Sequence, residues 1–292
     1  MTRPMATGQA GAAVDAVADR PSGTEAFPRP RARRLRLGRR TSSIVVTVVF
    51  GAILVGLWQL VGTNLEPLLL SYPSAVAGQA VHLIASGKLG SAFATSLEPF
   101  IPAYLMAVVV GIPIGLVLGR YRLAEVAIGP YVTAAYSTPL VALLPLFIVW
   151  FGIGFAAKVA IIFTLTVFPI IINTWRGVHS VPKTLTEVGS AFGASQGQIM
   201  WKIIVPGTLP HIMTGLRLGV GRAIIGVVIA EFFTAVSGLG GIIINAGNSF
   251  DTAQMFVPIL CILAWGVVLT WLVGIAERRL APWHVAMSGG GR

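Results

Sequence analysis

The chain has 292 residues, of which 55% are hydrophobic and only 11% are charged. Soluble globular domains carry about 25% charged residues, so this composition excludes an ordinary soluble domain and indicates a protein surrounded largely by lipid. The net charge of +11 is not in itself a sign of nucleic-acid binding, because nine of the 21 basic residues lie before residue 43 and abut an apolar run.

Residues 1–42 are rich in Ala, Gly, Pro and Arg and have no apolar period, which predicts a disordered basic tail. The arginines near the end of this tail are expected to hold it in the cytoplasm and to contact anionic lipid headgroups. Residues 44–62 then form an apolar run of 19 residues, long enough to cross a hydrocarbon core of about 30 Å as a helix. This length favours a first transmembrane helix over a cleaved signal peptide.

Further apolar runs complete a prediction of six transmembrane helices; they cover about residues 100–118, 131–151, 159–175, 213–235 and 255–275. The third span is interrupted by prolines, so either a kinked helix or a span with a re-entrant piece fits this segment. The predicted fold is therefore all-α, a polytopic membrane helical bundle over residues 43–280. A short cytoplasmic tail is expected at 281–292.

The basic residues predict the orientation of these spans. With the N-terminus inside the cell, all but Lys88 and Lys158 fall on the cytoplasmic side, as the positive-inside rule requires. Both termini are then cytoplasmic, and the longest cytoplasmic loop covers about residues 176–211. On the external side, the glycine-rich stretch at 237–241 is expected to be flexible, and it would move, line a vestibule or serve as a simple connector.

The long cytoplasmic loop contains the sequence Glu187-Val188-Gly189-Ser190-Ala191-Phe192-Gly193 and, ten residues later, Ile203-Ile204-Val205-Pro206. Thr184 and Thr186 are expected to cap a short helix that Gly193 ends. Residues 196–204 are expected to form a second helix, which the following proline closes. The pattern predicts a helix, a glycine turn and a second helix in a cytoplasmic loop.

This spacing resembles the cytoplasmic signature of ABC importer permeases, in which Glu-Ala-Ala, three residues, Gly and nine further residues precede Ile-x-Leu-Pro. Val188 and Gly189 stand for the two alanines, and Val205 stands for the leucine. The resemblance covers about residues 90–280. Over this range the sequence is similar in particular to permeases of the nitrate, sulfonate, taurine and bicarbonate group. Further matching segments are Thr95-Ser96-Leu97, Gly111-Ile112-Pro113, Phe151-Gly152-Ile153-Gly154, Arg176-Gly177-Val178, Thr214-Gly215-Leu216-Arg217 and Ala230-Glu231.

The resemblance implies the type I ABC importer permease fold and uptake of a small organic or oxyanionic solute across the bacterial inner membrane. It also implies a permease homodimer, with a heterodimer still open, two cytoplasmic ATPase subunits that bind ATP and Mg, and an extracytoplasmic solute-binding protein. The loop would be the coupling helix that fits a groove of the ATPase, and its matched positions are Glu187, Gly189, Ala191, Gly193, Ile203 and Pro206. The chain has no P-loop sequence, so it is not expected to be an enzyme or to hold a cofactor.

Polar residues within the apolar spans are candidates for the translocation path, because burying them in a membrane is costly. The acidic candidates are Glu98 and Glu231, for which the alternative is a structural partner on another helix. The other candidates, which can instead be bonded to their own helix, are Tyr136, Ser137, Thr138 and Asn173. Glu98 stands beside a position where the family often carries an arginine, which weakens the case for an oxyanion. If either glutamate held an ion or a proton, the chain would be an ion-coupled secondary transporter or a channel.

Gly111, Gly115 and Gly119 repeat at four-residue spacing in the second span and predict close helix packing, within the chain or across a permease dimer.

Ser195 lies in a G-x-S-x-G sequence typical of hydrolases, but its helical context argues against a nucleophile elbow. No metal site is expected, because the four histidines are too scattered for a site on one helix; they are His82, His179, His211 and His284.

Overall fold

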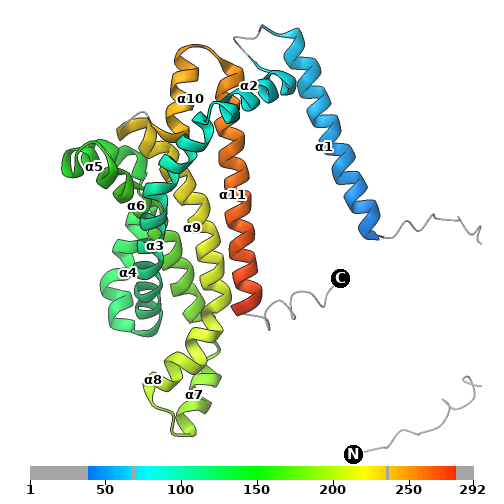
Figure 1. Cartoon of the computed structure of the whole chain (residues 1–292). Helices are drawn as coiled ribbons and strands as arrows, with labels where there is room; N and C mark the ends of the chain where they lie inside the picture. The colour runs from blue at the N-terminus through cyan, green and yellow to red at the C-terminus, as the bar shows by residue number, and fades with distance from the viewer. Residues whose placement is uncertain (1–38, 67–69, 235–236, 281–292) are drawn as a thin grey trace, which may run out of the picture. The chain divides into compact units, whose positions relative to one another are not determined.

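The computed structural model describes residues 39–66, 70–234 and 237–280, and all regular structure in these ranges is helical (Figure 1). The two predicted tails lie outside the described residues, apart from the helical residues 39–42. The chain divides into two units, Met1–Gly51 and Ala52–Arg292. The first helix, α1 (Arg39–Asn64), crosses that boundary, and all the other helices belong to the second unit.

The second unit consists of helices of very different lengths. The long ones follow the apolar runs of the sequence and are α3 (Lys88–Arg120), α6 (Phe155–Ser180), α9 (Val205–Thr234) and α11 (Thr252–Leu280). The shorter ones are α2 (Pro73–Ala85), α4 (Arg122–Ser137), the 3-10 turn η1 (Leu140–Leu143), α5 (Leu144–Phe151), α7 (Lys183–Ala191), α8 (Gln196–Ile199), the π-helical turn η2 (Met200–Ile204) and α10 (Gly238–Asn248).

Five helical segments in the described part of the chain are long and apolar enough to cross a membrane: Val45–Asn64, α3, Gln196–Thr234, α6 and α11. A sixth span requires α4 and residues 140–151 to count as one, and these two pieces are bent by 88°. The predicted third span at 131–151 is therefore not one continuous helix. It breaks at Thr138, whose backbone is extended (φ −70°, ψ 136°), because a proline disfavours helical geometry in the residue before it.

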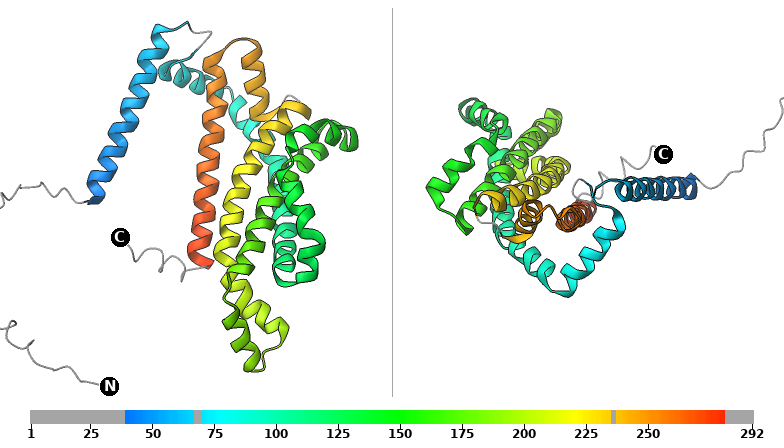
Figure 2. Two further views of the ribbon diagram at one scale, coloured as in Figure 1. Left: turned by 180° about the vertical axis from the view of Figure 1, so that it is seen from behind. Right: turned by 90° about the horizontal axis from the view of Figure 1, so that it is seen from above.

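Helix α6 forms the centre of the second unit and packs against both α3 and α9 (Figures 1 and 2). In its most apolar stretch 56% of the residues are buried, against 6% in the corresponding stretch of α11. Most of α11 therefore faces its surroundings, which for an apolar helix of this length is the expected behaviour of a lipid-facing span. An exception is Trp265, which is buried and whose ring centroid lies 4.7 Å from that of Phe100.

The contact between α3 and α6 is built on the three glycines spaced at four residues. A Cβ atom on Gly111 would lie 2.9 Å from Ile170 Cγ2, and one on Gly115 would lie 2.6 Å from Thr174 Cβ. A Cβ atom on Gly119 would overlap the side chain of Val178. Their partners also repeat every four residues, so the two helices meet along one face of each, and this contact lies within the chain.

The sequence predicted that Pro206 closes the second helix of the long cytoplasmic loop. In the structure this helix continues past Pro206. Together, α8, η2 and α9 form one run of 39 residues from Gln196 to Thr234. The π-helical turn explains how a proline is accommodated, since the N–H of Val205 bonds to the carbonyl of Met200, five residues back. A wider turn next to the proline relieves the clash between its ring and the preceding turn of the helix.

Two smaller expectations also differ from the structure. Helix α7 begins at Lys183, so Thr184 and Thr186 lie inside its first turn rather than capping it, and the Thr186 hydroxyl donates to the Lys183 carbonyl. The glycine-rich stretch at 237–241 forms the start of α10 and is not a plain connector, and Leu239 within it is fully buried. Buried neighbours supply the contacts that hold this stretch in place.

Candidate functional site

The loop motif forms a compact hairpin at one end of the second unit. We call the segment Lys183–Ile204, which comprises α7, α8 and η2, the α7–η2 hairpin. Figure 1 and the left panel of Figure 2 show it at the opposite end of this unit from α10. The motif residues are Glu187, Gly189, Ala191, Gly193 and Ile203 within the hairpin, and Pro206 two residues after its end.

The tip of the hairpin is a glycine turn. Gly193 has φ +76°, a left-handed conformation that residues with a Cβ atom rarely adopt. Its N–H bonds to the Ser190 carbonyl at 2.9 Å, and the N–H of Ala194 bonds to the Gly189 carbonyl at 3.0 Å. No atom lies within 4 Å of where a Cβ atom would stand on Gly193, so the constraint is backbone conformation and not space.

The second arm of the hairpin begins with a capping box. The Ser195 hydroxyl accepts a bond from the N–H of Gln198 (3.3 Å), and the side chain of Gln198 accepts a bond from the N–H of Ser195 (2.8 Å). This arrangement satisfies backbone donors that would otherwise be unpaired at a helix start. Ser195 therefore has a structural role in a helical turn, which is not the strand-to-helix setting of a hydrolase nucleophile.

The two arms of the hairpin touch where Gly189 faces η2. A Cβ atom on Gly189 would lie 2.8 Å from Ile203 Cδ1 and 3.6 Å from Ile199 Cγ1. Ile199 is buried in a small core together with Ile204 and Val178, which lies at the end of α6. The hairpin is thus packed on itself and anchored to the bundle by apolar contacts.

The outer face of α7 is apolar although it projects from the bundle. Leu185 and Val188 of α7 and Phe192, the residue that follows its end, are exposed and recur at the spacing of one helix face. Phe192 is 89% exposed, and Trp201 on the second arm is 70% exposed. Glu187 and Ala191 are also exposed. Exposed apolar side chains grouped in this way mark surfaces that bind another protein.

A second cluster lies at the start of α10 and contains Glu231. This residue is only 1% exposed, and both of its carboxylate oxygens accept hydrogen bonds. The hydroxyl of Ser96 on α3 donates to Oε1 at 2.6 Å, and the N–H of Gly240 donates to Oε2 at 2.8 Å. Ser96 in turn accepts a bond of 2.9 Å from the N–H of Leu239. The first turn of α10 is thereby bonded to both α3 and α9.

Lys158 and Gly238 complete this cluster. The ammonium group of Lys158, a residue only 6% exposed, donates to the Ser237 hydroxyl at 2.7 Å. Gly238 has φ +67°, and a Cβ atom there would collide with the Glu231 carboxylate. The positive start of a helix and a buried cation both stabilise a carboxylate at this position. The geometry therefore favours the structural alternative for Glu231.

The candidates for a translocation path are bonded to other groups or exposed, and they are not bonded to one another. Ser137 and Thr138 donate to carbonyls one turn back in α4, at 3.0 and 2.9 Å, and Asn173 donates to the Pro169 carbonyl at 2.7 Å. Glu98 and Tyr136 are exposed. Among residues 39–66, 70–234 and 237–280, no hydrogen bond joins any two of the six candidates, Glu98, Tyr136, Ser137, Thr138, Asn173 and Glu231.

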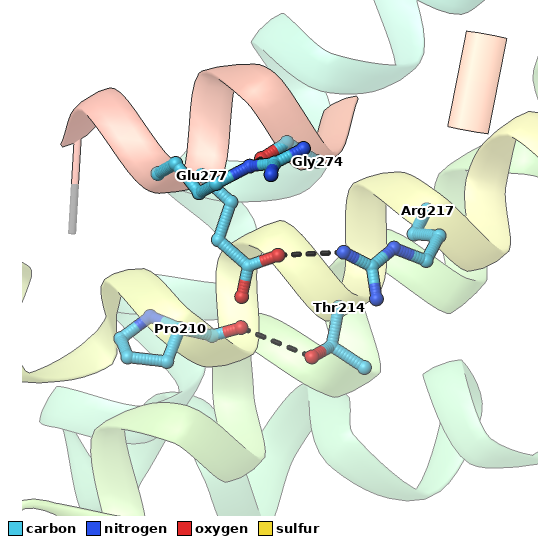
Figure 3. Close-up of polar contacts among 6 residues, drawn as sticks. Pro210, Thr214, Arg217, Gly274 and Glu277 are labelled. Carbon is cyan, nitrogen blue, oxygen red and sulfur yellow. Dashed lines mark hydrogen bonds and ion pairs between the residues drawn. The ribbon is translucent and has the colours of Figure 1, made fainter. Parts of the chain in front are cut away.

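Sequence reasoning missed several contacts between distant helices. Arg217 on α9 and Glu277 on α11 form an ion pair of 2.6 Å, and Thr214 bonds back to Pro210 beside it (Figure 3). The roles of Ser96 and Lys158 were also missed, since a single sequence does not reveal which helices adjoin. Within the described ranges, no group of three or more His, Cys, Asp or Glu residues could hold a metal ion.

Comparisons with known proteins give a consistent result. A family model described as binding-protein-dependent transport system inner membrane component matches residues 111–282. The chain is 32% identical over 248 residues to a probable ABC transporter permease protein of Brucella abortus (strain 2308), covering 85% of this chain and 99% of the relative. It is 32% identical over 262 residues to the taurine transport system permease protein TauC of Escherichia coli (strain K12), covering 87% and 92%.

The fold is also found among solved structures. An inward-facing structure of the MetNI methionine ABC transporter, in its native CY5 crystal form, matches with a TM-score of 0.55 at 21% sequence identity. The match covers 66% of this chain and 94% of that chain. At this identity the likeness establishes a shared fold.

Proposed function

We propose that this chain, which belongs to the family of binding-protein-dependent transport system inner membrane components, receives the energy of ATP hydrolysis through the α7–η2 hairpin. The chain is the permease subunit of an ABC importer and has the fold of the type I importer permeases. It is a membrane transport protein and not an enzyme, because the ATPase of such an importer is a separate subunit. This family membership leaves the alternative of an ion-coupled transporter without support.

The observation that carries the proposal is the apolar outer face of α7. Leu185, Val188 and Phe192 project into what the charge pattern predicts to be the cytoplasm, where an uncovered apolar face is unfavourable. A groove on an ATPase subunit would cover this face. Glu187, Gly189, Ala191, Gly193, Ile203 and Pro206 are the positions that we assign to coupling, by the resemblance of the motif and its spacing.

The helices behind the hairpin supply a route for movement. Because Gln196–Thr234 is one helical run of 39 residues, it extends about 58 Å at 1.5 Å per residue. Near its far end, Glu231 bonds to the first turn of α10 and to Ser96 of α3. A displacement of the hairpin would therefore be transmitted along this continuous helix, and from Glu231 to α10 and α3 through buried hydrogen bonds.

The distribution of charge supports the orientation that this mechanism needs. Arg120 and Arg122 lie at the hairpin ends of α3 and α4, and Lys183 is the first residue of the hairpin itself. Lys88 and Lys158 lie at the opposite ends of α3 and α6. The positive-inside rule then puts the hairpin in the cytoplasm and α10 on the external side. We infer that both termini are cytoplasmic and that the chain resides in the bacterial inner membrane.

The remaining partners follow from the family and are part of the same proposal. We assign two permease chains as a homodimer, two ATPase subunits that bind ATP and Mg, and an extracytoplasmic solute-binding protein that meets the α10 end. Membrane lipid surrounds the exposed apolar faces. The cargo is a small organic or oxyanionic solute, and a relative that is 32% identical is named for taurine transport.

Co-purification of the ATPase subunit tests the docking surface. Phe192→Ser removes the most exposed ring of the α7–η2 hairpin and should lower the amount of ATPase recovered with the tagged permease by about tenfold, as for a binding hot spot. Phe250→Ser is the matched control, because Phe250 is also exposed but lies at the opposite end, after α10. Unchanged recovery with Phe192→Ser, or an equal loss with the control, would contradict the proposal.

A further inference from the structure

A pocket of about 430 Å³ lies where the bundle meets the α7–η2 hairpin. It is formed by the end of α3, the start of α4, the end of α6 and the start of α7. Its polar lining residues are Arg120, Arg122, Glu125, His179, Lys183 and Thr186. The pocket thus brings together basic residues that are far apart in the sequence.

The charges in this pocket are poorly balanced. No carboxylate among the residues that the structure describes lies within 4.0 Å of the cationic groups of Arg120, Arg122 or Lys183. Arg120 donates to the side-chain oxygen of Gln196, which is neutral and leaves the charge of the guanidinium uncompensated. Glu125 is the acidic lining residue, and its carboxylate lies 3.6 Å from His179 Nε2. An anion in the pocket would relieve the repulsion among the cations.

The position of the pocket indicates which anion it receives. Arg120 is the last residue of α3 and Arg122 is the first of α4. Basic residues at the ends of apolar spans are typical of the zone where lipid headgroups begin. Beside these two arginines, Leu123 is 83% exposed and Val126 is 63% exposed on α4. An apolar surface next to a cationic pocket matches the acyl chain and the phosphate of one phospholipid molecule.

We propose that this pocket binds a phosphate-bearing anion, which its location identifies as the headgroup of an anionic phospholipid. The phosphate would lie between Arg122 of α4 and Lys183 of α7, with the guanidinium of Arg120 beside it. Bound there, the lipid joins the base of the hairpin to the bundle and stiffens the connection. This consequence for coupling rests on the proposed function, whereas the binding itself does not.

Lipid retention by the full-length permease tests the site directly. We would reconstitute it in nanodiscs of phosphatidylcholine and phosphatidylglycerol and count retained phosphatidylglycerol by native mass spectrometry. The double variant Arg122→Gln with Lys183→Gln should weaken retention by about 10- to 30-fold, since each basic residue near an anionic lipid contributes on the order of fivefold. The control double variant, Arg278→Gln with Arg279→Gln, removes the same charge from the end of α11 and should retain the lipid.

Inorganic phosphate in pure phosphatidylcholine nanodiscs distinguishes the source of the anion. If phosphatidylglycerol is retained through Arg122 and Lys183, the headgroup assignment holds. If instead only free phosphate raises the unfolding temperature, and only with these two residues present, the anion site stands but the lipid assignment is wrong. Equal retention by wild type and both double variants overturns the site. Neither result depends on whether the hairpin binds an ATPase, so failure of the site and failure of the proposed function are separable.

Discussion

The N–H of Gly240 donates a hydrogen bond of 2.8 Å to the carboxylate of Glu231, so a side chain of α9 caps the first turn of α10. Because Ser96 bonds to the other carboxylate oxygen, three helices meet at one buried acidic group. A buried carboxylate is costly unless its oxygens are bonded. The bonded carboxylate of Glu231 joins the C-terminal end of α9 to α10 and α3, at the far end from the α7–η2 hairpin.

Glu231→Gln should lower the free energy of unfolding by about 1–3 kcal/mol, because an amide has one acceptor oxygen where two donors, Ser96 and Gly240, require one each. Glu231→Leu removes both acceptors and should lower it further. The free energy of unfolding of both variants can be measured by titration with SDS, with the remaining helicity as the readout. The control is Glu98→Gln, which changes an exposed glutamate on α3 and should have little effect. Equal stability of Glu231→Leu and wild type would show that the cluster does not support the fold.

Gly189→Ala tests the contact between the arms of the hairpin. The added Cβ atom would lie 2.8 Å from Ile203 Cδ1, so the arms must shift apart and coupling of hydrolysis to uptake should fall. Ile203→Val removes that methyl group and should restore coupling in the double variant. Uptake per ATP hydrolysed in proteoliposomes is the measurement, with the solute identified from the co-purified binding protein. A double variant no better than Gly189→Ala would place the defect elsewhere.

Gly193→Asp should leave membrane insertion intact and uncouple ATP hydrolysis from uptake. Its φ of +76° disfavours a side chain at this turn, so the tip of the hairpin would be displaced. Gly197→Asp is the matched control, because Gly197 also has open space around it but lies in α8 without a left-handed backbone. Normal uptake per ATP by Gly193→Asp would rule out the role assigned to this turn.

The ion pair between Arg217 and Glu277 should contribute little to stability. Arg217 is partly exposed, and such pairs stabilise a protein by about 0.2–1 kcal/mol. Arg217→Glu places two negative charges together and should lower the free energy of unfolding by slightly more than the pair contributes. Adding Glu277→Arg exchanges the two charges and should restore stability. SDS unfolding at low and high salt is the measurement, and high salt should diminish the differences. A loss well above this range would mean that the pair is far better shielded from solvent than its exposure indicates.

Helical content and most span positions could be predicted from the sequence, because long apolar runs and the scarcity of charge dictate membrane helices. The turn at Gly193 was also predictable, since glycine is the residue that favours its backbone conformation. Pro206 misled the prediction, because only the structure shows the π-helical turn that carries the helix past it. A local rule about proline fails where the surrounding helix can widen.

Contacts between distant residues were the part that sequence reasoning could not supply. Glu231 was a candidate because an acidic residue in an apolar run is costly, but its partners Ser96 and Gly240 lie on other helices. The exposure of Phe192 was equally hidden, since the motif contains the residue without indicating which way the helix faces. Both depend on which helices pack together, and neither periodicity nor composition determines that.

Cross-linking from the hairpin tests most directly whether it is the surface that meets the ATPase. Cys261 is the single cysteine of the chain, so Cys261→Ser provides a background without thiols. In that background, Phe192→Cys carrying a short photoactivatable cross-linker should give a covalent adduct of permease and ATPase in membranes, and Phe250→Cys should give none. An adduct from Phe250→Cys and none from Phe192→Cys would contradict the account.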